Sequence, residues 1–491
     1  MTAASPGGAQ RRPEENPEFG ENPEPAENPE PGESAGPGEQ GGSVVTMRVA
    51  YVLGTTAGGT GSHVAMLARE CAARGMRVRI FGPHASGQRF FPAQRARAAR
   101  PDVASNPGTA EAVAGRASVA ADEPPAFVVV DIADRPRPAH DLATVLRLRR
   151  LLRAWAPDIV HAHGLRAGAF TALALTALPP AHMRHHPLIL TFQSYLRKSL
   201  QDREKVSRQK PGQEEAGGTG RRRWERCALV VTMHNAPPTG GMNGLVYAIL
   251  ERIVARRADA VTWVSSDLGA RMRRAGARDG GRALVPAAEF TPPSAEQIAA
   301  VRASLGEQRP VVLAAGRLVA QKGYPVLLAA ATRWQHREPV PLLVIAGEGP
   351  LVGPLTARSR AAGTDVRFLG LRADVPALLA VADVVVVPSR WEGQPLIVQE
   401  SLRAGRPLVA SRVGGIPALT GEDGALLVPP GDPGRLASAV ASVLDDPVLS
   451  RHLATAAAAR AAALPSPSVA VDAAVAVYAR LTRHDSPRPE G

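Results

Sequence analysis

The sequence predicts an α/β protein built from two doubly wound units in tandem, with a ligand cleft between them. Short runs rich in Val, Ile and Leu alternate with helical segments from Met47 onward, as expected for parallel sheets covered on both faces. A Pro-containing stretch with few strand formers, residues 287–309, interrupts this alternation, which then begins again. The chain has 491 residues, a length that suits two domains of common size.

The first 46 residues have the composition of an acidic tail without a fold. Residues 1–46 carry nine Glu against two Arg, and they repeat Glu-Asn-Pro-Glu with Gly and Pro between the repeats. Such a segment cannot bury enough apolar surface to offset the entropy of the chain, so we predict disorder here. Met47 opens the first strand-like run and is an alternative start of the protein.

The first unit is expected to span residues 47–290. A helix should follow the first glycine loop and run from Ser62, as its cap, to about Ala73. Strands are expected at 47–53, 76–81, 127–132, 158–162, 228–233, 260–264 and 283–285. Further helices are expected at 139–155, 166–177 and 243–258, and another should be capped by Ser265 or Ser266.

A basic insert, residues 184–227, interrupts the first unit. The runs 188–194 and 229–235 share one pattern, and either could supply the sheet strand at this point. The insert is rich in Lys and Arg and has scattered apolar residues, which suggests docking on an anionic membrane surface. A solvated, disordered loop is the alternative.

The second unit is expected to span residues 308–464, and residues 465–491 should form a C-terminal helix and tail. Strands are predicted at 311–315, 342–346, 366–369, 384–387, 408–410 and 426–428, and helices at 324–334, 351–362, 374–381 and 396–404 and then to about 463. The amphipathic stretch 468–481 follows two prolines and predicts the last helix.

Several classes of protein are disfavoured by composition. No apolar run reaches the about 20 residues that a membrane span needs. Two cysteines, Cys71 and Cys227, form no disulfide framework, which predicts a reduced, cytoplasmic setting. The net charge of +13 indicates an anionic partner such as nucleotide phosphates. Nucleic acid is a weaker candidate, because the basic residues are spread along the chain and stacking aromatics are scarce.

The first glycine loop joins a strand to a helix and predicts a phosphate site. It reads Gly58-Gly59-Thr60-Gly61-Ser62-His63. Glycine lets the backbone approach a phosphate, and the N–H groups and dipole of a helix N-terminus attract anions. A tight turn is the alternative interpretation. A dinucleotide fingerprint is disfavoured, because Val64 stands after His63 and the second strand ends without an acidic residue.

Two cations in the second unit indicate a diphosphate site. Arg317 follows the unit's first strand, and Gln321-Lys322-Gly323 should open the next helix. Arginine offers a fork of donors and lysine a point charge, which together suit a diphosphate. Solvated surface cations are the ordinary alternative. The chain has only four Lys, however, and Lys322 is the one outside the insert, which favours a functional role.

Two later loops carry the candidate acidic residues. The first loop, between the strand 342–346 and the next helix, reads Gly347-Glu348-Gly349-Pro350. The second loop, between the strand 384–387 and the helix 396–404, contains Trp391-Glu392-Gly393-Gln394-Pro395. Glu400 lies in the helix that the second loop introduces, where a carboxylate can accept hydrogen bonds from the vicinal hydroxyls of a ribose. Glu392 lies in the loop and can meet a sugar.

Three histidines end strands of the first unit. They are His161, His163 and His234. No Cys or acidic residue accompanies them at metal-ligand spacing, so no metal is predicted. We expect structural roles for His161 and His163, whereas His234 is placed to reach the cleft.

Together these motifs resemble the retaining GT-B glycosyltransferases of family 4, which include phosphatidylinositol mannosyltransferases and glycogen-synthase-like enzymes. The resemblance runs from about Met47 to Leu481 without the insert and is strongest over 310–431. Its elements are Gly-Gly-x-x-Ser-His-Val, Val-His-Ala-His at 160–163, Thr-x-His at 232–234, Gly-Arg-x4-Lys-Gly at 316–323, Gly-Glu-Gly-Pro at 347–350 and Glu-x7-Glu at 392–400. It implies two tandem Rossmann-like domains, and the Thr-x-His match favours 228–233 as the strand beside the insert.

The resemblance also implies roles for the site residues and no cofactor other than the donor substrate. Gly58 and Gly59 should approach the diphosphate of a UDP- or GDP-sugar. Arg317 and Lys322 should neutralise it as the nucleotide leaves, without a metal. The remaining implied contacts are His234 near the transferred sugar, Glu400 on the ribose, Gly347 and Glu348 on the donor, and Glu392 with Gly393, Gln394, Pro395 and Leu396 on the sugar.

The acceptor is not identified by the sequence. Relatives often have Pro-Asn-Gly at the end of the first domain, where this chain has Pro286-Ala287-Ala288. They also often have Phe-Gly after the Glu392 position, where this chain has Gly393-Gln394-Pro395. The leading prediction is a cytoplasmic retaining hexosyltransferase, in peripheral contact with the inner membrane face if the insert binds lipid. A sugar-nucleotide epimerase on the same fold and a basic nucleic-acid-binding protein are the alternatives.

Overall fold

The computed structural model describes residues 46–56, 58–92, 125–133, 137–176, 227–235, 241–286, 290–306 and 309–483. The predicted acidic tail and the insert up to residue 226 lie outside these residues. The alternative strand at 188–194 lies outside them as well.

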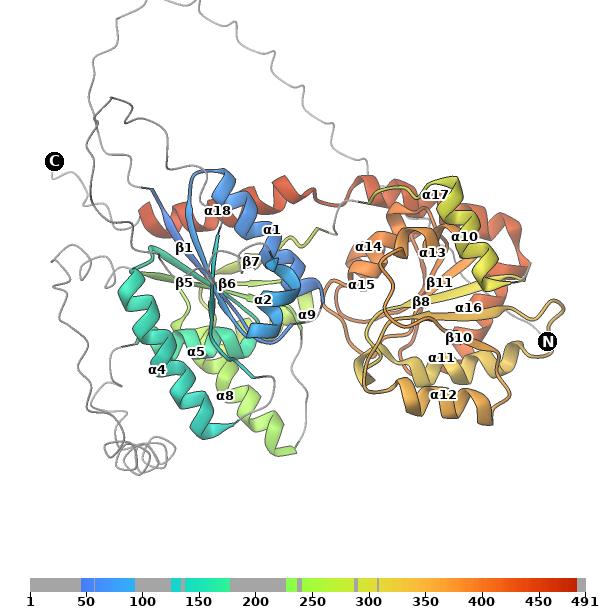
Figure 1. Cartoon of the computed structure of the whole chain (residues 1–491), viewed down its shortest axis with the longest axis horizontal. Coiled ribbons are helices and arrows are strands. Elements are labelled where there is room, and N and C mark those ends of the chain that lie inside the picture. Colours follow the sequence, from blue (N-terminus) through green and yellow to red (C-terminus); the bar gives the residue numbers. More distant parts are fainter. Residues whose placement is uncertain are drawn as a thin grey trace, which may run out of the picture. The chain divides into compact units, whose positions relative to one another are not determined.

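The first unit is built on a seven-stranded parallel sheet (Figure 1). Its strand order is β3-β2-β1-β4-β5-β6-β7. The strands are β1 (Arg48–Leu53), β2 (Arg77–Gly82), β3 (Ala126–Val129), β4 (Ile159–His163), β5 (Ala228–Met233), β6 (Ala260–Trp263) and β7 (Gly280–Arg282). The strand predicted at 228–233 is therefore confirmed as β5, between β4 and β6.

Two strand predictions in this sheet are wrong in their bounds. The strand expected at 283–285 is β7 at Gly280–Arg282, and β3 ends at Val129 rather than at Ile132. In each case the end of the neighbouring strand sets where the backbone pairing stops. Trp263, the last residue of β6, accepts the N–H of Ala283 beyond Arg282, and β2 ends at Gly82, which accepts the N–H of Val130.

Helices cover both faces of the first sheet. They are α1 (Gly59–Ala73), α2 (His84–Phe90), α4 (Pro138–Trp155), α5 (Leu165–Leu175), α8 (Gly241–Arg257), α9 (Ser266–Ala275) and α18 (Pro467–Arg483). Figure 1 shows α5 and α8 on one face and α1 and α18 on the other. Successive residues of β1 point to opposite faces, so Val52 packs with the α4, α5 and α8 cluster and Tyr51 with the α1 and α18 cluster.

The second unit has a six-stranded parallel sheet. Its order is β10-β9-β8-β11-β12-β13. The strands are β8 (Val311–Ala315), β9 (Leu342–Ala346), β10 (Val366–Phe368), β11 (Val384–Val387), β12 (Leu408–Ser411) and β13 (Leu426–Val428). Each strand lies within two residues of its predicted bounds, because continuous apolar runs mark strands buried on both faces.

Helices cover the second sheet in the same way. They are α10 (Ala295–Leu305), α11 (Tyr324–Ala331), α12 (Val352–Ala361), α13 (Val375–Val381), α14 (Leu396–Arg403), α15 (Ile416–Thr420), α16 (Pro433–Asp445) and α17 (Pro447–Ala462), with 3-10 turns η3 (Ala320–Lys322) and η4 (Thr332–Trp334). One apolar core packs α10, α13 and α14 on the sheet, and the other packs α11, α12 and α16.

The last helix returns to the first sheet. Val471 and Tyr478 of α18 are fully buried, and they pack with Val49 and Tyr51 of β1. The sequence predicted this helix but not the element that it covers. No single described helix has the length and apolar content to cross a membrane, although α17 and α18, which meet at a bend of 43°, pass such a test as a pair.

One predicted helix start is corrected and two are confirmed. The first helix begins at Gly59, after Gly58, so Ser62 lies inside α1 and does not cap it. Ser265 occupies the N-cap of α9 as predicted, although its side chain makes no capping hydrogen bond. The helix predicted from residue 324 begins at Tyr324, directly after the short turn η3 that contains Lys322.

Candidate functional site

A cleft of about 920 Å³ is lined by loops that follow the strands of both sheets. Loops at the carboxyl ends of parallel strands are where doubly wound folds bind ligands. Every site residue predicted from the sequence lines this cleft. These residues are Gly58, Gly59, His234, Arg317, Lys322, Gly347, Glu348, Glu392, Gly393, Gln394, Pro395, Leu396 and Glu400.

The glycine loop places the N-terminus of α1 at the cleft. A Cβ atom on Gly58 would meet nothing within 4 Å, so the backbone there is open to a ligand. A Cβ on Gly59 would lie 3.2 Å from Cγ of Leu396, in the second unit. The first turn of α1 therefore presents its backbone N–H groups at the cleft, a geometry that suits an anion.

The two predicted cations of the second unit differ in their partners. Arg317 is exposed, and its guanidinium group makes no hydrogen bond or ion pair with the described part of the chain. The Lys322 ammonium instead lies 2.6 Å from Oε1 of Glu392, and the two side chains are 19% and 4% exposed. Arg317 is thus available to a diphosphate, whereas Lys322 already holds a carboxylate.

The carboxylate of Glu392 is held on several sides. Ser389 donates its hydroxyl to Oε1 over 2.7 Å, and the side-chain amide of Gln321 lies 3.4 Å from Oε2 and 3.0 Å from the carbonyl of Trp391. The sequence placed Glu392 in the loop to meet a sugar and did not foresee its ion pair with Lys322. Glu392, the predicted contact of the sugar, is therefore paired with Lys322, the predicted contact of the diphosphate.

Close backbone packing explains two glycines of the site. Gly347 has φ 141°, and a Cβ there would lie 2.0 Å from the carbonyl oxygen of Gly316. The loops that follow β8 and β9 therefore contact each other through their backbones. A Cβ on Gly393 would lie 2.0 Å from the carbonyl oxygen of His234 in the first unit. Next to it, Gln394 donates its side-chain amide to the carbonyl of Val264 over 3.0 Å.

Glu400 lies one turn into α14, on the cleft side. Burial raises the pKa of its carboxyl, and the nearby Arg403 opposes this shift. The carboxyl group of Glu400 has no hydrogen-bond or ion-pair partner among the described residues. A half-buried carboxylate without a partner is suited to accept hydrogen bonds from hydroxyl groups of a ligand.

Histidines line the cleft from the first unit. Nε2 of His234 lies 3.0 Å from Nδ1 of His163, and the ring of His63 packs edge-on against both. Burial lowers the pKa of His163 and of His234 well below the ordinary value, and that of His63 to about 4. His161 lies deeper, with Tyr478 and Thr232 on its ring nitrogens, which fits the predicted structural role.

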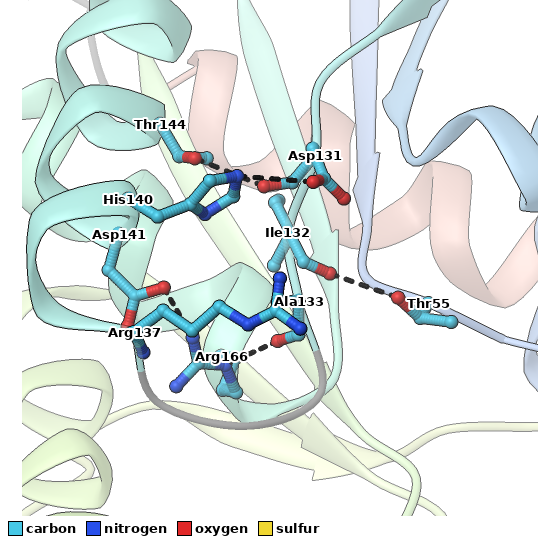
Figure 2. A network of polar contacts seen from close by, with 9 residues as sticks. All are labelled: Thr55, Asp131, Ile132, Ala133, Arg137, His140, Asp141, Thr144 and Arg166. Carbon is cyan, nitrogen blue, oxygen red and sulfur yellow. Dashed lines mark hydrogen bonds and ion pairs between the residues drawn. The ribbon is translucent and has the colours of Figure 1, made fainter.

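Arginines that the sequence did not single out complete the wall of the first unit. Arg89 and Arg166 line the cleft. Figure 2 shows Arg166 held between the carbonyl of Ala133, at 2.7 Å, and the carboxylate of Asp141, at 2.8 Å. The same carboxylate accepts the backbone N–H of Arg137. Arg166 is thereby fixed in place beside the cleft.

The loop that Arg166 holds is fixed from its other side as well. The N–H and hydroxyl groups of Thr55 both lie within 3.3 Å of the Ile132 carbonyl, and Thr144 donates to the Asp131 carbonyl over 3.0 Å (Figure 2). His140 lies 3.1 Å from the Asp131 carboxylate. Hydrogen bonds from several elements therefore hold residues 131–133 in place on the first-unit side of the cleft.

Two family models match this architecture. The model described as Glycosyl transferase 4-like domain matches residues 58–288, and the model described as Glycosyl transferases group 1 matches residues 309–446. The matches contain the glycine loop, the histidines, both cations and both glutamates of the cleft. The chain is a glycosyltransferase with a 4-like domain followed by a group 1 domain.

Curated proteins similar to this glycosyltransferase act on different molecules. It is 33% identical over 251 residues to alpha-D-kanosaminyltransferase of Streptomyces kanamyceticus, a match that covers 47% of this chain and 63% of that protein. It is 28% identical to glycogen synthase of Mycobacterium tuberculosis, over 82% of this chain and 86% of that protein. The first match spans less than two thirds of its relative.

Solved structures confirm the predicted GT-B fold of the glycosyltransferase. HepE of Anabaena in complex with UDP superposes with a TM-score of 0.62 at 18% identity, over 88% of this chain and all of that one. Sucrose-phosphate synthase of Thermosynechococcus elongatus superposes with a TM-score of 0.61 at 19% identity, over 89% and 100%. At these identities the likeness is one of fold.

Sequence reasoning missed the cleft residues of the glycosyltransferase that carry no motif. Arg89 lies in α2 and Arg166 in α5, and arginine is so frequent in this chain that neither stood out. His63 is buried beside the cleft histidines without lining the cleft itself, and it was quoted only as part of the glycine loop. Its place one residue after Ser62 in an expected helix gave the available signal, because α1 turns this side chain toward His163 and His234.

Proposed function

We propose that this glycosyltransferase moves a sugar from a nucleotide-sugar donor to a hydroxyl acceptor with retention of anomeric configuration. The observation that carries the proposal is the convergence of Arg317, Lys322 and the N-terminus of α1 on one cleft that also contains Glu400. Cations and a helix N-terminus suit a diphosphate, and the carboxylate suits the ribose attached to it.

In this proposal the second unit binds the donor. Glu400 accepts hydrogen bonds from the ribose hydroxyls, and Arg317 and Lys322 neutralise the diphosphate. When the diphosphate binds Lys322, it competes with Glu392 for the same ammonium group. The Glu392 carboxylate and the loop through Leu396 are then available to the donor sugar. Gly347 and Glu348 line the same cleft and are proposed to contact the donor as well.

Departure of the nucleotide is the step in which negative charge grows on the diphosphate. Fixed cations stabilise such charge without reorganising during the reaction. Arg317 and Lys322 supply two positive charges at the proposed position, so we propose a metal-independent reaction with no cofactor. His234 lies on the opposite wall and is proposed to contact the transferred sugar.

The acceptor is proposed to enter from the wall of the first unit, beside Thr55, Arg89 and Arg166. UDP is the first nucleotide to test, because HepE was solved with UDP, and GDP and ADP are the comparisons. Peripheral docking of the insert on the anionic inner face of a membrane remains a hypothesis, since its residues up to 226 lie outside the described structure.

A two-stage experiment tests the proposal. Thermal-shift screening with UDP-, GDP- and ADP-sugars identifies the donor, and proton NMR of the product then reports the anomeric configuration. An axial donor linkage that gives an axial product supports retention, and an equatorial product contradicts it. Donor conversion that needs no acceptor would instead indicate an epimerase. Transfer that survives EDTA supports the metal-independent reaction, and transfer restored only by added Mg²⁺ or Mn²⁺ contradicts it.

A further inference from the structure

The ring nitrogens of the cleft histidines are not equivalently partnered. Nδ1 of His163 lies 3.0 Å from Nε2 of His234. Nε2 of His163 is buried and has no hydrogen-bond partner among the described residues. His161 differs, because Tyr478 and Thr232 each lie 2.6 Å from one of its nitrogens. Nδ1 of the neighbouring His63 is buried without a described partner as well, but of these two rings only that of His163 is within hydrogen-bond distance of His234.

Both rings of the pair are neutral near pH 7. Burial is the largest cause that lowers the pKa of each, and neighbouring imidazoles lower it further. A neutral imidazole carries one N–H, on one nitrogen or the other. The contact between His163 and His234 therefore contains one proton, and it allows two arrangements.

The two arrangements leave different groups without a partner. If His234 donates from Nε2, the proton of His163 must lie on Nε2, where a buried N–H would face no acceptor. If His163 donates from Nδ1, only an unprotonated nitrogen is left at its Nε2. Buried N–H groups without partners are rarer in proteins than under-satisfied acceptors, so the second arrangement is favoured.

We infer that His163 is a positioning residue that fixes His234 as the Nδ1–H tautomer, so that His234 presents a hydrogen-bond donor to the cleft. Nδ1 of His234 has no partner in the described part of the chain, and His234 lines the cleft. A donor at this position binds a hydroxyl or ring oxygen of the ligand. It cannot accept a proton there, so Nδ1 of His234 is not the general base for the acceptor hydroxyl.

The tautomer can be measured directly. Long-range nitrogen–proton correlation NMR on protein labelled with ¹⁵N-histidine, without any substrate, separates a protonated ring nitrogen from an unprotonated one. The His234 signals are assigned by their loss in His234→Gln. We expect Nδ1 to be protonated and Nε2 unprotonated in the wild type. The reverse pattern overturns the inference, whatever the enzyme transfers.

Two substitutions at His163 separate donation from packing. In His163→Asn the side-chain N–H₂ occupies the place of Nδ1 and can still donate to His234, whereas His163→Phe keeps the ring volume without a donor. We expect the Nδ1–H tautomer to persist in His163→Asn and to become mixed in His163→Phe. If His163→Phe leaves the tautomer of His234 unchanged, His163 does not position it.

The identity of the oxygen that His234 binds rests on the proposed function, and kinetics test that part alone. We expect His163→Phe to lower kcat/KM by about tenfold, the worth of one hydrogen bond, and His163→Asn to recover most of that loss. Equal losses in the two variants contradict the role in catalysis. Thermal melting followed by circular dichroism checks that both variants fold. If His163→Phe does not fold, the tautomer measured in the wild type decides the inference.

Discussion

The two walls of the cleft differ in the groups that meet near Gly393. On the side of the second unit these groups are ionised, with Lys322 and Glu392 in contact and Arg317 exposed. On the side of the first unit, where Arg89 and Arg166 line the cleft as well, they are the imidazoles of His163 and His234, which burial keeps neutral. The pair of imidazoles therefore suits a ligand by the direction of hydrogen bonds, whereas the groups of the second unit suit it by charge. Substitutions on the two walls should therefore differ in their effects on activity, nucleotide binding and stability.

The largest loss is expected from Lys322→Ala. Removing one fixed donor from a site of developing charge lowers kcat by roughly 10²–10³-fold. The change also leaves the buried Glu392 carboxylate without its counter-ion, so the protein should unfold at lower denaturant concentration. Steady-state kinetics and urea titration measure the two effects, with the exposed Arg451→Ala as the control. Full activity in Lys322→Ala would show that the charged wall does not stabilise the leaving nucleotide.

The next effect separates the two glutamates of the charged wall. A hydrogen bond to a charged group contributes about 1.5–3 kcal/mol, so Glu400→Gln should weaken binding of the bare nucleoside diphosphate about ten- to a hundredfold. Glu392→Gln should not weaken it, because the substitution releases Lys322 to the diphosphate. Transfer should fall in both variants. Calorimetry with UDP or GDP measures binding, and equal weakening by both substitutions would refute the assigned roles.

A smaller effect is expected where the two walls meet. Ala at Gly393 would place its Cβ 2.0 Å from the carbonyl of His234, and overpacking of this kind costs about 1–3 kcal/mol. Because this backbone belongs to the loop of Glu392, kcat should fall together with stability. Gly353→Ala is the matched control, since a Cβ there meets nothing within 4 Å. The predicted contact is absent if both variants have the same midpoint in urea.

The smallest effect is the pH dependence of stability that Glu400 contributes. Burial raises the pKa of this carboxyl above its ordinary value of 4.5, so the folded state holds the proton more tightly than the unfolded state. The carboxyl therefore destabilises the protein progressively as pH rises above 4.5, until it is ionised in the folded state too. Glu400→Gln should gain stability over wild type as pH rises, by urea titration at several pH values. The exposed Glu422→Gln, which does not line the cleft, is the control, and a gain that shrinks with pH contradicts the prediction.

Local pattern was enough to predict most elements, and tertiary pairing accounts for the errors. The apolar run 384–387 became β11 within the second sheet because its composition needs burial on both faces. The strand predicted at 283–285 was displaced to Gly280–Arg282, because β6 determines where an edge strand can pair. The cap predicted at Ser62 was wrong because Gly58 and Gly59 allow the helix to begin earlier.

The sequence was sufficient to predict the two α/β units, the glycines at strand ends, and those cleft side chains that belong to motifs. These follow from periodicity and turn chemistry, which act over a few residues. Only the tertiary structure decided which side chains meet. Lys322 finds Glu392 across 70 residues, His163 finds His234 across 71, and Tyr478 reaches His161 across 317. Such contacts depend on strand order and helix packing, which no local pattern encodes, and they determine which charges are paired and which imidazole nitrogens contact each other.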